Sequence, residues 1–554
     1  MRDSYDFIVV GAGSAGCALA ARLSEEASAD VLLVEAGPDS RSWKVEMPLA
    51  VDQLLTSPAF NWEFETEAEP GLGGRKIGQP RGRVVGGSSA INGMVYTRAN
   101  PQDFDEWRDD LGCRGWGYAD VLPYFRRMER GPRTESRYRG TAGPMQVSYP
   151  KLQNPLNRAF LQAAKDCGYP TTEDANGAQQ EGFGAAEMSI RGGRRLSTAR
   201  AYLTDTVRRR ANLTIAAGTL VDTLIFDGRR VSGVRLSRDG AHHDVLSRKS
   251  VVLCAGAVGS PHLLMRSGIG PAQHLRERGI DVVLDLPAVG SNLQDHPDLA
   301  IQYACTKPVT LLRHARGLGR VMTGLSWFLY KGGVAASNQF EASAYIRTRA
   351  GIRKPNLKLE FFPLAVSPID YKPYPTDAFQ IHMTMQNAQS RGSVRLRDGR
   401  PGTAPELRVN YLSDDADLKT YREAVGLVRE LIGSRAFDPY RGAELDPGGD
   451  VKSEADLDAW IRSRVTTAYH LSCTCRMGGA DDPAAVVGPD LTVRGIEGLR
   501  IADASIMPHV VTANLNATVI MIGERAADFC LGRQSLPADN APYWVHPEWQ
   551  TAQR

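Results

Sequence analysis

The hydrophobic positions at the start of the chain come in short runs separated by glycine-rich turns. Residues 7–10 are apolar and mostly β-branched, which is typical of a buried strand, and residues 15–23 are small or apolar with good helix propensity. Residues 31–34 form a second apolar run that ends at Glu35, and residues 250–255 form a third that leads into an apolar helix. Strands that alternate with helices predict an α/β domain with a parallel sheet.

From about residue 301 onward, apolar positions alternate with polar ones. Residues 379–385 follow this period of two and residues 357–362 are similar, as expected for strands with one covered face. Residues 417–432 place apolar side chains on one side of a helix. Antiparallel strands with covering helices predict an α+β second domain, where a substrate would be met. The first pattern returns at residues 499–505, so the first domain is predicted to be discontinuous.

The first glycine-rich turn has the spacing of a dinucleotide-binding site. It consists of Gly11, Ala12, Gly13, Ser14, Ala15 and Gly16. Gly11 permits a tight turn, Gly13 allows the backbone to approach a pyrophosphate, and Gly16 allows the helix to pack closely on the strand. The N–H groups at the helix start would face the phosphates. Glu35 would accept hydrogen bonds from both ribose hydroxyls of an adenosine, and a turn that binds nothing leaves this carboxylate unexplained.

Length, composition and charge narrow the class of protein. A chain of 554 residues is expected to form two domains or more, and 42% hydrophobic with 23% charged residues is typical of a globular protein. A formal charge of +3 gives no reason to expect nucleic acid as a partner. No apolar run is long enough to predict a spanning helix, and the first strand begins too close to Met1 for a secretory signal. The eight scattered cysteines suit a reducing cytoplasm.

Two further stretches each allow two interpretations. Residues 82–96 contain adjacent glycines and serines before an apolar run, which predicts either backbone donors near a cofactor or a turn-rich connection. Residues 191–210 are locally basic. We interpret them as a solvated helix face rather than a binding patch, because the surrounding charge is balanced.

Four separated stretches resemble hallmarks of one protein family. Residues 82–105 and 256–270 are similar to the two signature patterns of the glucose–methanol–choline oxidoreductase family, and residues 289–296 and 502–508 are similar to further hallmarks. The resemblance covers nearly the whole chain in the family's order. It is strongest to the branch of choline dehydrogenases and flavin-dependent alcohol dehydrogenases, which have a close counterpart of residues 470–478.

This resemblance implies FAD as the cofactor. It assigns cofactor contacts to Gly11, Gly13, Ser14, Ala15, Gly16, Glu35, Arg83, Gly86, Gly87, Asn92, Val95, Val221, Asp503 and Ala504. Asn92 and Val95 match contacts to the isoalloxazine region, and Val221 matches an adenine contact. Some family members attach the flavin covalently through a histidine just before the matching asparagine. Ile91 stands at that position and cannot form the bond, so non-covalent FAD is predicted.

His470 and Asn514 match the catalytic pair of the family. Alcohol oxidation requires removal of the hydroxyl proton while hydride leaves for flavin N5, and an imidazole with a pKa of about 6.5 suits that proton. Asn514 would donate a hydrogen bond to the substrate oxygen. His470 with Cys473 and Cys475 also resembles a zinc site, but the spacing is compact and a fourth ligand is missing, so no metal is predicted.

The substrate is less well defined by the sequence. Recognition of a quaternary ammonium requires a carboxylate and aromatic rings. Glu341 beside Phe340, and Glu360 beside Phe361 and Phe362, are candidates for such a site. The alternative is that these carboxylates are ordinary charges on the face of a strand.

The resemblance also sets expected domain boundaries. The FAD-binding domain would comprise residues 1–155, 196–300 and 465–535, and the substrate-binding domain residues 156–195 and 301–464. Residues 536–554 form a polar tail with aromatic residues, which would cover either its own chain or a neighbouring subunit.

The leading functional hypothesis is an FAD-dependent dehydrogenase that oxidises a choline-like, aliphatic or aryl primary alcohol to the aldehyde. Its acceptor would be a quinone or similar carrier, which implies a cytoplasmic protein with peripheral association to the inner membrane. One alternative is an oxidase that reduces oxygen to hydrogen peroxide, and another is a non-oxidising flavoprotein. A pyridine-nucleotide disulfide reductase would require a second full glycine fingerprint and a redox cysteine pair near the first domain, and neither is present. The sequence does not define the oligomeric state, and a homo-oligomer is one alternative.

Overall fold

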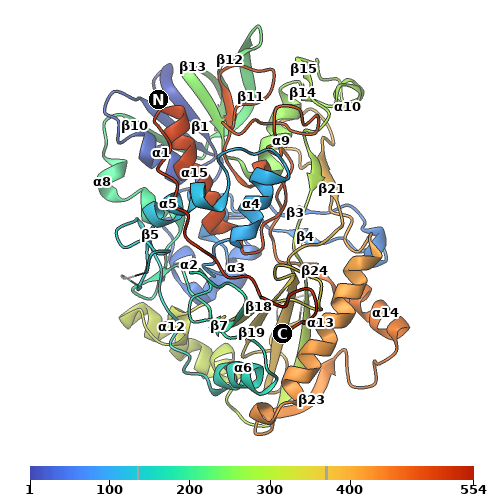
Figure 1. Ribbon diagram of the computed structural model, residues 1–554. Coiled ribbons are helices and arrows are strands. Elements are labelled where there is room, and N and C mark those ends of the chain that lie inside the picture. Colours follow the sequence, from blue (N-terminus) through green and yellow to red (C-terminus); the bar gives the residue numbers. More distant parts are fainter. Residues whose placement is uncertain (134–135, 368–371) are drawn as a thin grey trace.

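A computed structural model describes residues 1–133, 136–367 and 372–554. It contains two large sheets, one above the other, with helices packed around each (Figure 1). The upper sheet holds the N-terminal strands, and the lower sheet is built from the middle of the chain. This two-sheet arrangement confirms the predicted combination of an α/β domain with an α+β domain.

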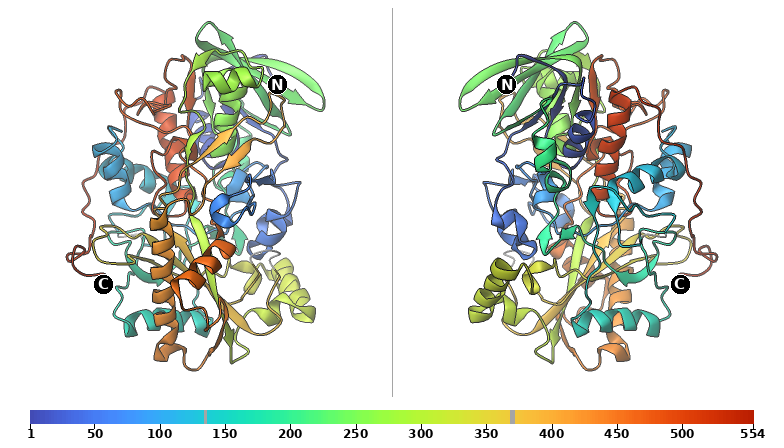
Figure 2. Two further views of the ribbon diagram at one scale, coloured as in Figure 1. Left: turned by 90° about the vertical axis from the view of Figure 1, so that its right-hand side faces the viewer. Right: turned by 90° about the vertical axis from the view of Figure 1, so that its left-hand side faces the viewer.

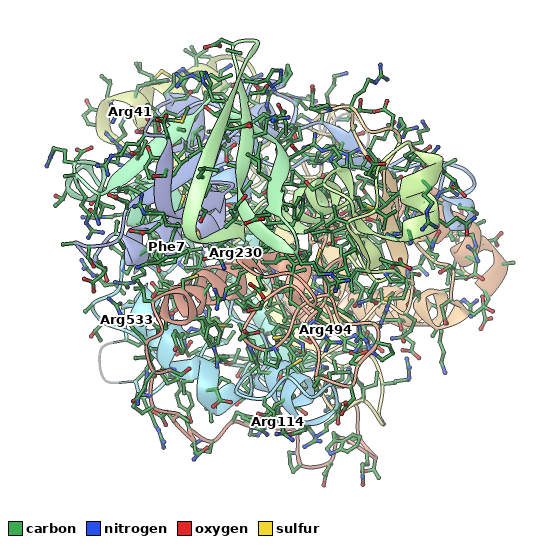
Figure 3. All side chains as sticks on the ribbon, turned by 90° about the horizontal axis from the view of Figure 1, so that it is seen from above. Phe7, Arg41, Arg114, Arg230, Arg494 and Arg533 are labelled. Atoms are coloured by element: carbon green, nitrogen blue, oxygen red, sulfur yellow. The ribbon has the colours of Figure 1, made fainter. Side chains whose placement is uncertain are left out.

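The upper sheet has seven strands in the order β10-β2-β1-β13-β12-β11, with β25 also paired to β13. Its strands are β1 (Ser4–Val10), β2 (Val31–Glu35), β10 (Leu213–Ala217), β11 (Leu220–Asp227), β12 (Arg230–Arg238), β13 (Ala241–Leu253) and β25 (Leu499–Ile501). The pairs of β1 with β2, β2 with β10, β1 with β13 and β13 with β25 are parallel, whereas β11, β12 and β13 form antiparallel hairpins. Seen from above, Phe7 lies within this sheet while Arg41 and Arg533 lie at its periphery (Figure 3).

Apolar content explains why the parallel strands lie at the centre. Every residue of β2 is buried, and so is every residue of β1 after Ser4. Helices α1 (Ser14–Leu23) and α15 (Asn516–Cys530) pack against each other beside this sheet (Figure 1). The two helices come from opposite ends of the chain, and β25 lies shortly before α15. The first domain is therefore discontinuous, as the returning pattern near residue 499 predicted.

The lower sheet is antiparallel throughout its pairs, in the order β23-β17-β20-β19-β18-β7 with β24 also paired to β17. Its strands are β7 (Gly182–Ala185), β17 (Pro297–Cys305), β18 (Ala342–Ile346), β19 (Leu357–Phe362), β20 (Ala378–Met385), β23 (Arg441–Asp446) and β24 (Thr466–Thr467). Helices α6 (Pro155–Asp166) and α13 (Asp415–Gly433) contact one face of the sheet. The predicted boundary at residue 300 falls inside β17, because that strand begins at Pro297.

Further helices and strands lie outside the two large sheets. The remaining helices are α2 (Trp43–Glu46), α3 (Val51–Leu55), α4 (Pro101–Asp109), α5 (Tyr118–Met128), α7 (Thr198–Tyr202), α8 (Asp205–Arg208), α9 (Gly256–Arg266), α10 (Ala272–Glu277), α11 (Leu312–Ala315), α12 (Gly317–Tyr330) and α14 (Glu454–Arg464). The remaining strands are β3 (Phe64–Glu65), β4 (Gly78–Gln79), β5 (Glu129–Arg130), β6 (Met145–Gln146), β8 (Ile190–Arg191), β9 (Arg194–Arg195), β14 (Ile269–Gly270), β15 (Leu284–Asp285), β16 (Ser291–Leu293), β21 (Gly392–Arg395) and β22 (Glu406–Arg408). None of the described helices is both long and apolar enough to cross a membrane.

The C-terminal tail runs along its own chain from the upper to the lower part of the molecule (Figure 1). Near its start, Asp539 forms ion pairs with Arg126 and Arg137. At its end, the Arg554 guanidinium pairs with Glu430 of α13 at 2.7 Å. Of the two expectations for this segment, the structure supports the one in which the tail covers its own chain.

Candidate functional site

A continuous cavity of about 930 Å³ runs between the two sheets. One end is lined by Gly13 and Glu35 of the upper sheet region, and the other by Phe340 and Glu360 at the lower sheet. His470 lines the cavity between these two ends. The structure therefore brings residues from three distant parts of the chain to one space.

The first glycine-rich turn has the geometry that its spacing predicts. Gly11 has a φ of +101°, a conformation that residues with a Cβ rarely adopt. A Cβ on Gly16 would lie 2.0 Å from the carbonyl oxygen of Gly11, so helix α1 and the turn approach as closely as expected. Gly13 has room for a Cβ, whose nearest neighbour would be 3.7 Å away. Protein packing therefore does not by itself require glycine at position 13.

Glu35 ends strand β2 and is buried at the cavity wall. Its carboxylate accepts hydrogen bonds from the backbone N–H groups of Ala12 at 3.0 Å and Gly37 at 2.9 Å. Burial raises the pKa of this carboxyl to about 7, although the two N–H donors and Arg83 favour the charged form. These two bonds leave acceptor sites on the oxygens for ribose hydroxyls.

A second glycine-rich segment lies against the first. The Gly86 N–H donates to the carbonyl of Ala12 at 2.7 Å. A Cβ on Gly87 would lie 2.6 Å from the Cα of Gly13, and Gly87 has a φ of +51°. This contact favours the cofactor interpretation of residues 82–96 over a simple connection, because it places Gly87 on the same cavity wall as Gly13.

Asn92 follows this segment and lines the cavity with Val95. Its side-chain oxygen accepts hydrogen bonds from the Met94 N–H at 3.1 Å and from Nη1 of Arg195 at 2.8 Å. Arg195 is only 1% exposed, and burial lowers the pKa of its guanidinium to about 9. The prediction that residues 191–210 form a solvated helix face is therefore wrong for Arg195. This buried side chain orients the Asn92 amide through the hydrogen bond to its oxygen. Its neighbours in sequence gave no signal that distinguished it from the exposed arginines.

A third segment completes the wall near the upper sheet. The buried carboxylate of Asp503 accepts from the N–H of Gly256 at 2.8 Å, from the Ser260 hydroxyl at 2.5 Å and from the Ser505 N–H at 2.8 Å. Asp503, Ala504 and Val221 line the cavity. These contacts join β25 to the start of α9.

Three predicted cofactor residues do not line the cavity. Gly16 and Gly86 act through packing, as described above. The Arg83 side chain is exposed, and its guanidinium lies 5.1 Å from the centre of the Trp62 ring in a cation–π contact. Its electrostatic influence on Glu35 remains.

His470 and Asn514 meet at the cavity. Nε2 of His470 lies 3.4 Å from Nδ2 of Asn514, and Nδ1 of His470 lies 2.9 Å from Nδ1 of His296. Lys358 donates from Nζ to Oδ1 of Asn514 at 2.6 Å. Because an ammonium can only donate, it fixes the Asn514 oxygen on its own side and turns the amide N–H groups toward His470. Neither Lys358 nor His296 lies in a pattern that predicts this role.

The surroundings keep His470 in its neutral form. Burial lowers the pKa of this imidazole well below its usual 6.5, and His296, Lys358 and Arg81 lower it further. The backbone N–H groups of His470 and His296 both donate to Oδ1 of Asp295, at 2.7 and 2.9 Å. Asp295 therefore holds the two segments that carry the histidines together.

The predicted substrate residues separate into two groups. Glu360 and Phe362 line the cavity with Phe340, whose ring stacks on that of Phe362 at 4.8 Å. Phe361 does not line the cavity, because alternate residues of β19 point to opposite faces of the sheet. Its ring packs in the core against Phe379. Glu341 does not line the cavity either, since its carboxylate accepts from the Leu152 N–H and the Ser337 hydroxyl. The structure thus corrects the assignment of Phe361 and Glu341 to this wall.

The zinc interpretation finds no support in the described part of the chain. Cys473 and Cys475 are buried free thiols, and burial raises the pKa of Cys473 to about 12. No group of three or more metal-binding side chains occurs among the described residues.

The wall as a whole fits FAD. A left-handed glycine, the N-terminus of α1 and a buried carboxylate at the end of β2 form the cradle that the ADP half of a dinucleotide requires. The same cavity continues to His470 and Asn514.

Comparison with known proteins identifies the family. Residues 5–298 match the N-terminal and residues 388–523 the C-terminal family model described as GMC oxidoreductase. The chain is 45% identical over 549 residues to the oxygen-dependent choline dehydrogenase of Rhizobium etli and 43% identical to that of Brucella ovis, with 99% of this chain and 100% of each relative covered.

Solved structures agree with this assignment. Pyridoxine 4-oxidase from Mesorbium loti superposes with a TM-score of 0.87 at 33% identity, covering 96% of this chain and 100% of that one. A fungal aryl-alcohol oxidase gives a TM-score of 0.81 at 27% identity over 96% of this chain and 99% of that one. The chain therefore belongs to the GMC oxidoreductase family and is an FAD-dependent oxidoreductase similar to choline dehydrogenases.

Proposed function

We propose that the protein oxidises a primary alcohol to the aldehyde, with His470 as general base. The observation that carries this proposal is the pair formed by His470 Nε2 and Asn514 Nδ2, 3.4 Å apart on the cavity that Gly13 and Glu35 also line. An acceptor and a donor this close together can both contact one hydroxyl oxygen that lies beside them.

The residues have distinct roles in this reaction. Bound FAD supplies the acceptor for the hydride at flavin N5. His470 takes the hydroxyl proton as the C–H bond breaks and the C=O bond forms, and its lowered pKa keeps it ready as a base. Asn514 donates to the alcohol oxygen, and Lys358 and His296 hold the pair in place.

We propose that FAD is held without a covalent bond. Ile91 is buried at the cavity wall, and its side chain has no nucleophilic atom. The position that carries a covalent histidine in some family members is therefore unable to make the link here.

The electron acceptor defines two candidate functions. A dehydrogenase would pass electrons to a quinone or similar carrier, whereas an oxidase would use oxygen and produce hydrogen peroxide. Two similar solved proteins are described as oxidases, which favours testing oxygen directly. Reducing the holoenzyme with an alcohol under anaerobic conditions and then admitting air separates the two: rapid reoxidation identifies an oxidase, and a persistently reduced flavin identifies a dehydrogenase.

A membrane quinone as acceptor is supported by the surface of α12. Leu318, Val321, Leu325 and Leu329 lie along one side of this helix and are 46–77% exposed. Arg313, Arg316 and Arg320 are exposed beside them, and no acidic residue occurs between positions 299 and 340. An apolar stripe with a basic border suits the surface of an anionic bilayer. Figure 2 shows this helix at the outer edge of the molecule beside α2 and α3, and its residues Thr323 and Phe328 line the cavity.

We therefore propose that a cytoplasmic protein docks peripherally through α12. Sedimentation with vesicles of anionic phospholipid should pull down the wild type, and the variant Val321→Asp/Leu329→Asp should stay in the supernatant. Leu246→Asp, at a 50% exposed leucine on β13, serves as the matched control and should sediment normally. Equal sedimentation of all three proteins contradicts the docking proposal.

The reaction itself is tested by mixing the holoenzyme anaerobically with a panel of primary alcohols. Bleaching of the flavin by at least one alcohol, lost in His470→Ala, supports the proposed function. Failure of every alcohol to bleach the flavin supports the non-oxidising alternative instead.

A further inference from the structure

The substrate end of the cavity contains carboxylates, and each one on the lower sheet is paired with a basic side chain. In the described part of that sheet, the acidic residues that line the cavity are Asp298, Glu360 and Asp446. Their partners are His382 at 2.7 Å, Lys358 at 2.5 Å and Arg464 at 3.0 Å. This wall is therefore polar, and none of these three carboxylates is without a partner.

The ion pair of Lys358 and Glu360 is the most enclosed of the three. The Lys358 side chain is 1% exposed, and it reaches both the Glu360 carboxylate and the Asn514 amide. Burial lowers the pKa of this ammonium, but Glu360 and Tyr345 raise it, and the net result lies above the usual 10.5. Lys358 therefore stays charged and cancels the charge of Glu360.

The second pair joins a carboxylate to a neutral imidazole. Strand β17 presents Asp298 to Nδ1 of His382 on β20. Nε2 of His382 lies 2.7 Å from Nε2 of Gln380, whose Oε1 accepts from the Val366 N–H and from Gln302. This amide therefore donates to Nε2 of His382, so the proton of the imidazole is on Nδ1, where the Asp298 carboxylate accepts it.

The rest of this wall offers rings and neutral hydrogen-bonding groups. The Phe340 and Phe362 rings stack at 4.8 Å, and the His382 ring meets Phe340 edge-on at 5.8 Å. Gln302, Gln380 and Thr384 line the cavity beside them. Such a wall can pack on an aromatic ring and pair with its uncharged polar substituents.

Resting on the proposed function, we propose that the site selects uncharged primary alcohols that carry an aromatic ring, and that it discriminates against quaternary ammonium alcohols such as choline. A buried trimethylammonium group requires an unpaired carboxylate in addition to aromatic rings. Lys358 pairs with the Glu360 carboxylate, which would otherwise be available to bind a trimethylammonium group. Lys358 therefore acts as a specificity-determining residue.

The test uses three alcohols with the holoenzyme under anaerobic conditions. Choline and 3,3-dimethyl-1-butanol have nearly the same shape and differ in charge, and benzyl alcohol adds the ring. The second-order rate constant of flavin reduction should be at least about tenfold higher for dimethylbutanol than for choline, and higher again for benzyl alcohol. A choline rate equal to or above that of its uncharged isostere overturns the inference. Reduction by none of a broad alcohol panel would instead refute the proposed function.

Variants of the ion pair test the cause. Lys358→Gln leaves Glu360 without its cation, so the ratio of choline to dimethylbutanol rates should rise by at least about tenfold. Glu360→Gln should lower that ratio, and the double variant should return it toward the wild-type value. The ratio within one variant cancels any general loss of activity from the altered contact with Asn514. An unchanged ratio in Lys358→Gln contradicts the assignment.

Discussion

Replacing Asp295 by alanine tests whether the segments that carry His470 and His296 are held by one buried acceptor. The carboxylate receives the backbone N–H of both histidines on one oxygen and the hydroxyl groups of Thr467 and Tyr411 on the other. Asp295 is 3% exposed, so water reaches this position poorly. Asp295→Ala leaves both backbone donors without the acceptor that positions them.

The expected magnitude follows from those donors. A buried hydrogen-bonding group left unpaired costs about 1–3 kcal/mol, so the two N–H groups together predict a loss of about 2–6 kcal/mol in the free energy of unfolding. Asp295→Asn keeps an oxygen for the two N–H groups, and the two hydroxyls can rotate to accept from the new amide. We therefore expect Asn to lose much less stability than Ala.

Thermal unfolding monitored by flavin fluorescence measures the stability, and anaerobic stopped-flow spectroscopy measures flavin reduction. Asp295→Ala should unfold at a lower temperature and reduce its flavin more slowly, because His470 is no longer fixed. Asp295→Asn is the matched control and should resemble the wild type in both measurements. An alanine variant with wild-type stability and a wild-type reduction rate would refute the reasoning.

Three further predictions concern the base, the cradle and the cofactor link. Because the pKa of His470 is lowered well below 6.5, this base stays neutral as the pH falls through the neutral range. The rate of flavin reduction at saturating alcohol should therefore be constant across neutral pH and decline only in acid. A decline with its midpoint near pH 6.5 would show that the pKa of His470 is not lowered. Gly16→Ala places a Cβ 2.0 Å from a carbonyl oxygen and should destabilise the apoprotein, whereas Gly13→Ala should leave the apoprotein stable and weaken FAD binding by at least about tenfold, as measured by fluorescence titration. Acid precipitation should release all of the flavin into the supernatant, and yellow colour retained in the pellet would contradict the non-covalent proposal.

The local pattern of apolar and polar residues predicted the fold, because the hydrophobic period of each strand is visible within a few consecutive residues. The buried run of β1 and the alternating run of β20 both appear in the sequence at the right positions. The single covered face expected for β20 is wrong, because seven of its eight residues are buried and its polar side chains Gln380 and Thr384 form hydrogen bonds with side chains of β17. The discontinuity of the first domain was also visible, since the pattern of β25 repeats that of the N-terminal strands. The start of β17 at Pro297 was not, because it directly follows residues 289–296, a stretch that resembles a family hallmark rather than the approach to a strand.

The candidate site was predicted only as far as its residues fall in motifs. His470 and Asn514 were found by resemblance, and the structure brings them within 3.4 Å. Lys358, His296 and Arg195 were missed because their roles arise from contacts between residues 103 to 174 positions apart in the chain. The prediction that Phe361 lies at the substrate site is wrong because Phe361 and Glu360 are neighbours in sequence but point to opposite faces of β19.

The central claim is that His470 removes the proton while Asn514 holds the alcohol oxygen. Its most direct test is the rate of anaerobic flavin reduction in His470→Ala, with the reducing alcohol identified in the wild type. The account predicts that the variant still binds FAD and that its reduction rate falls by about 100- to 10,000-fold. A variant that binds FAD and is reduced at the wild-type rate would contradict it.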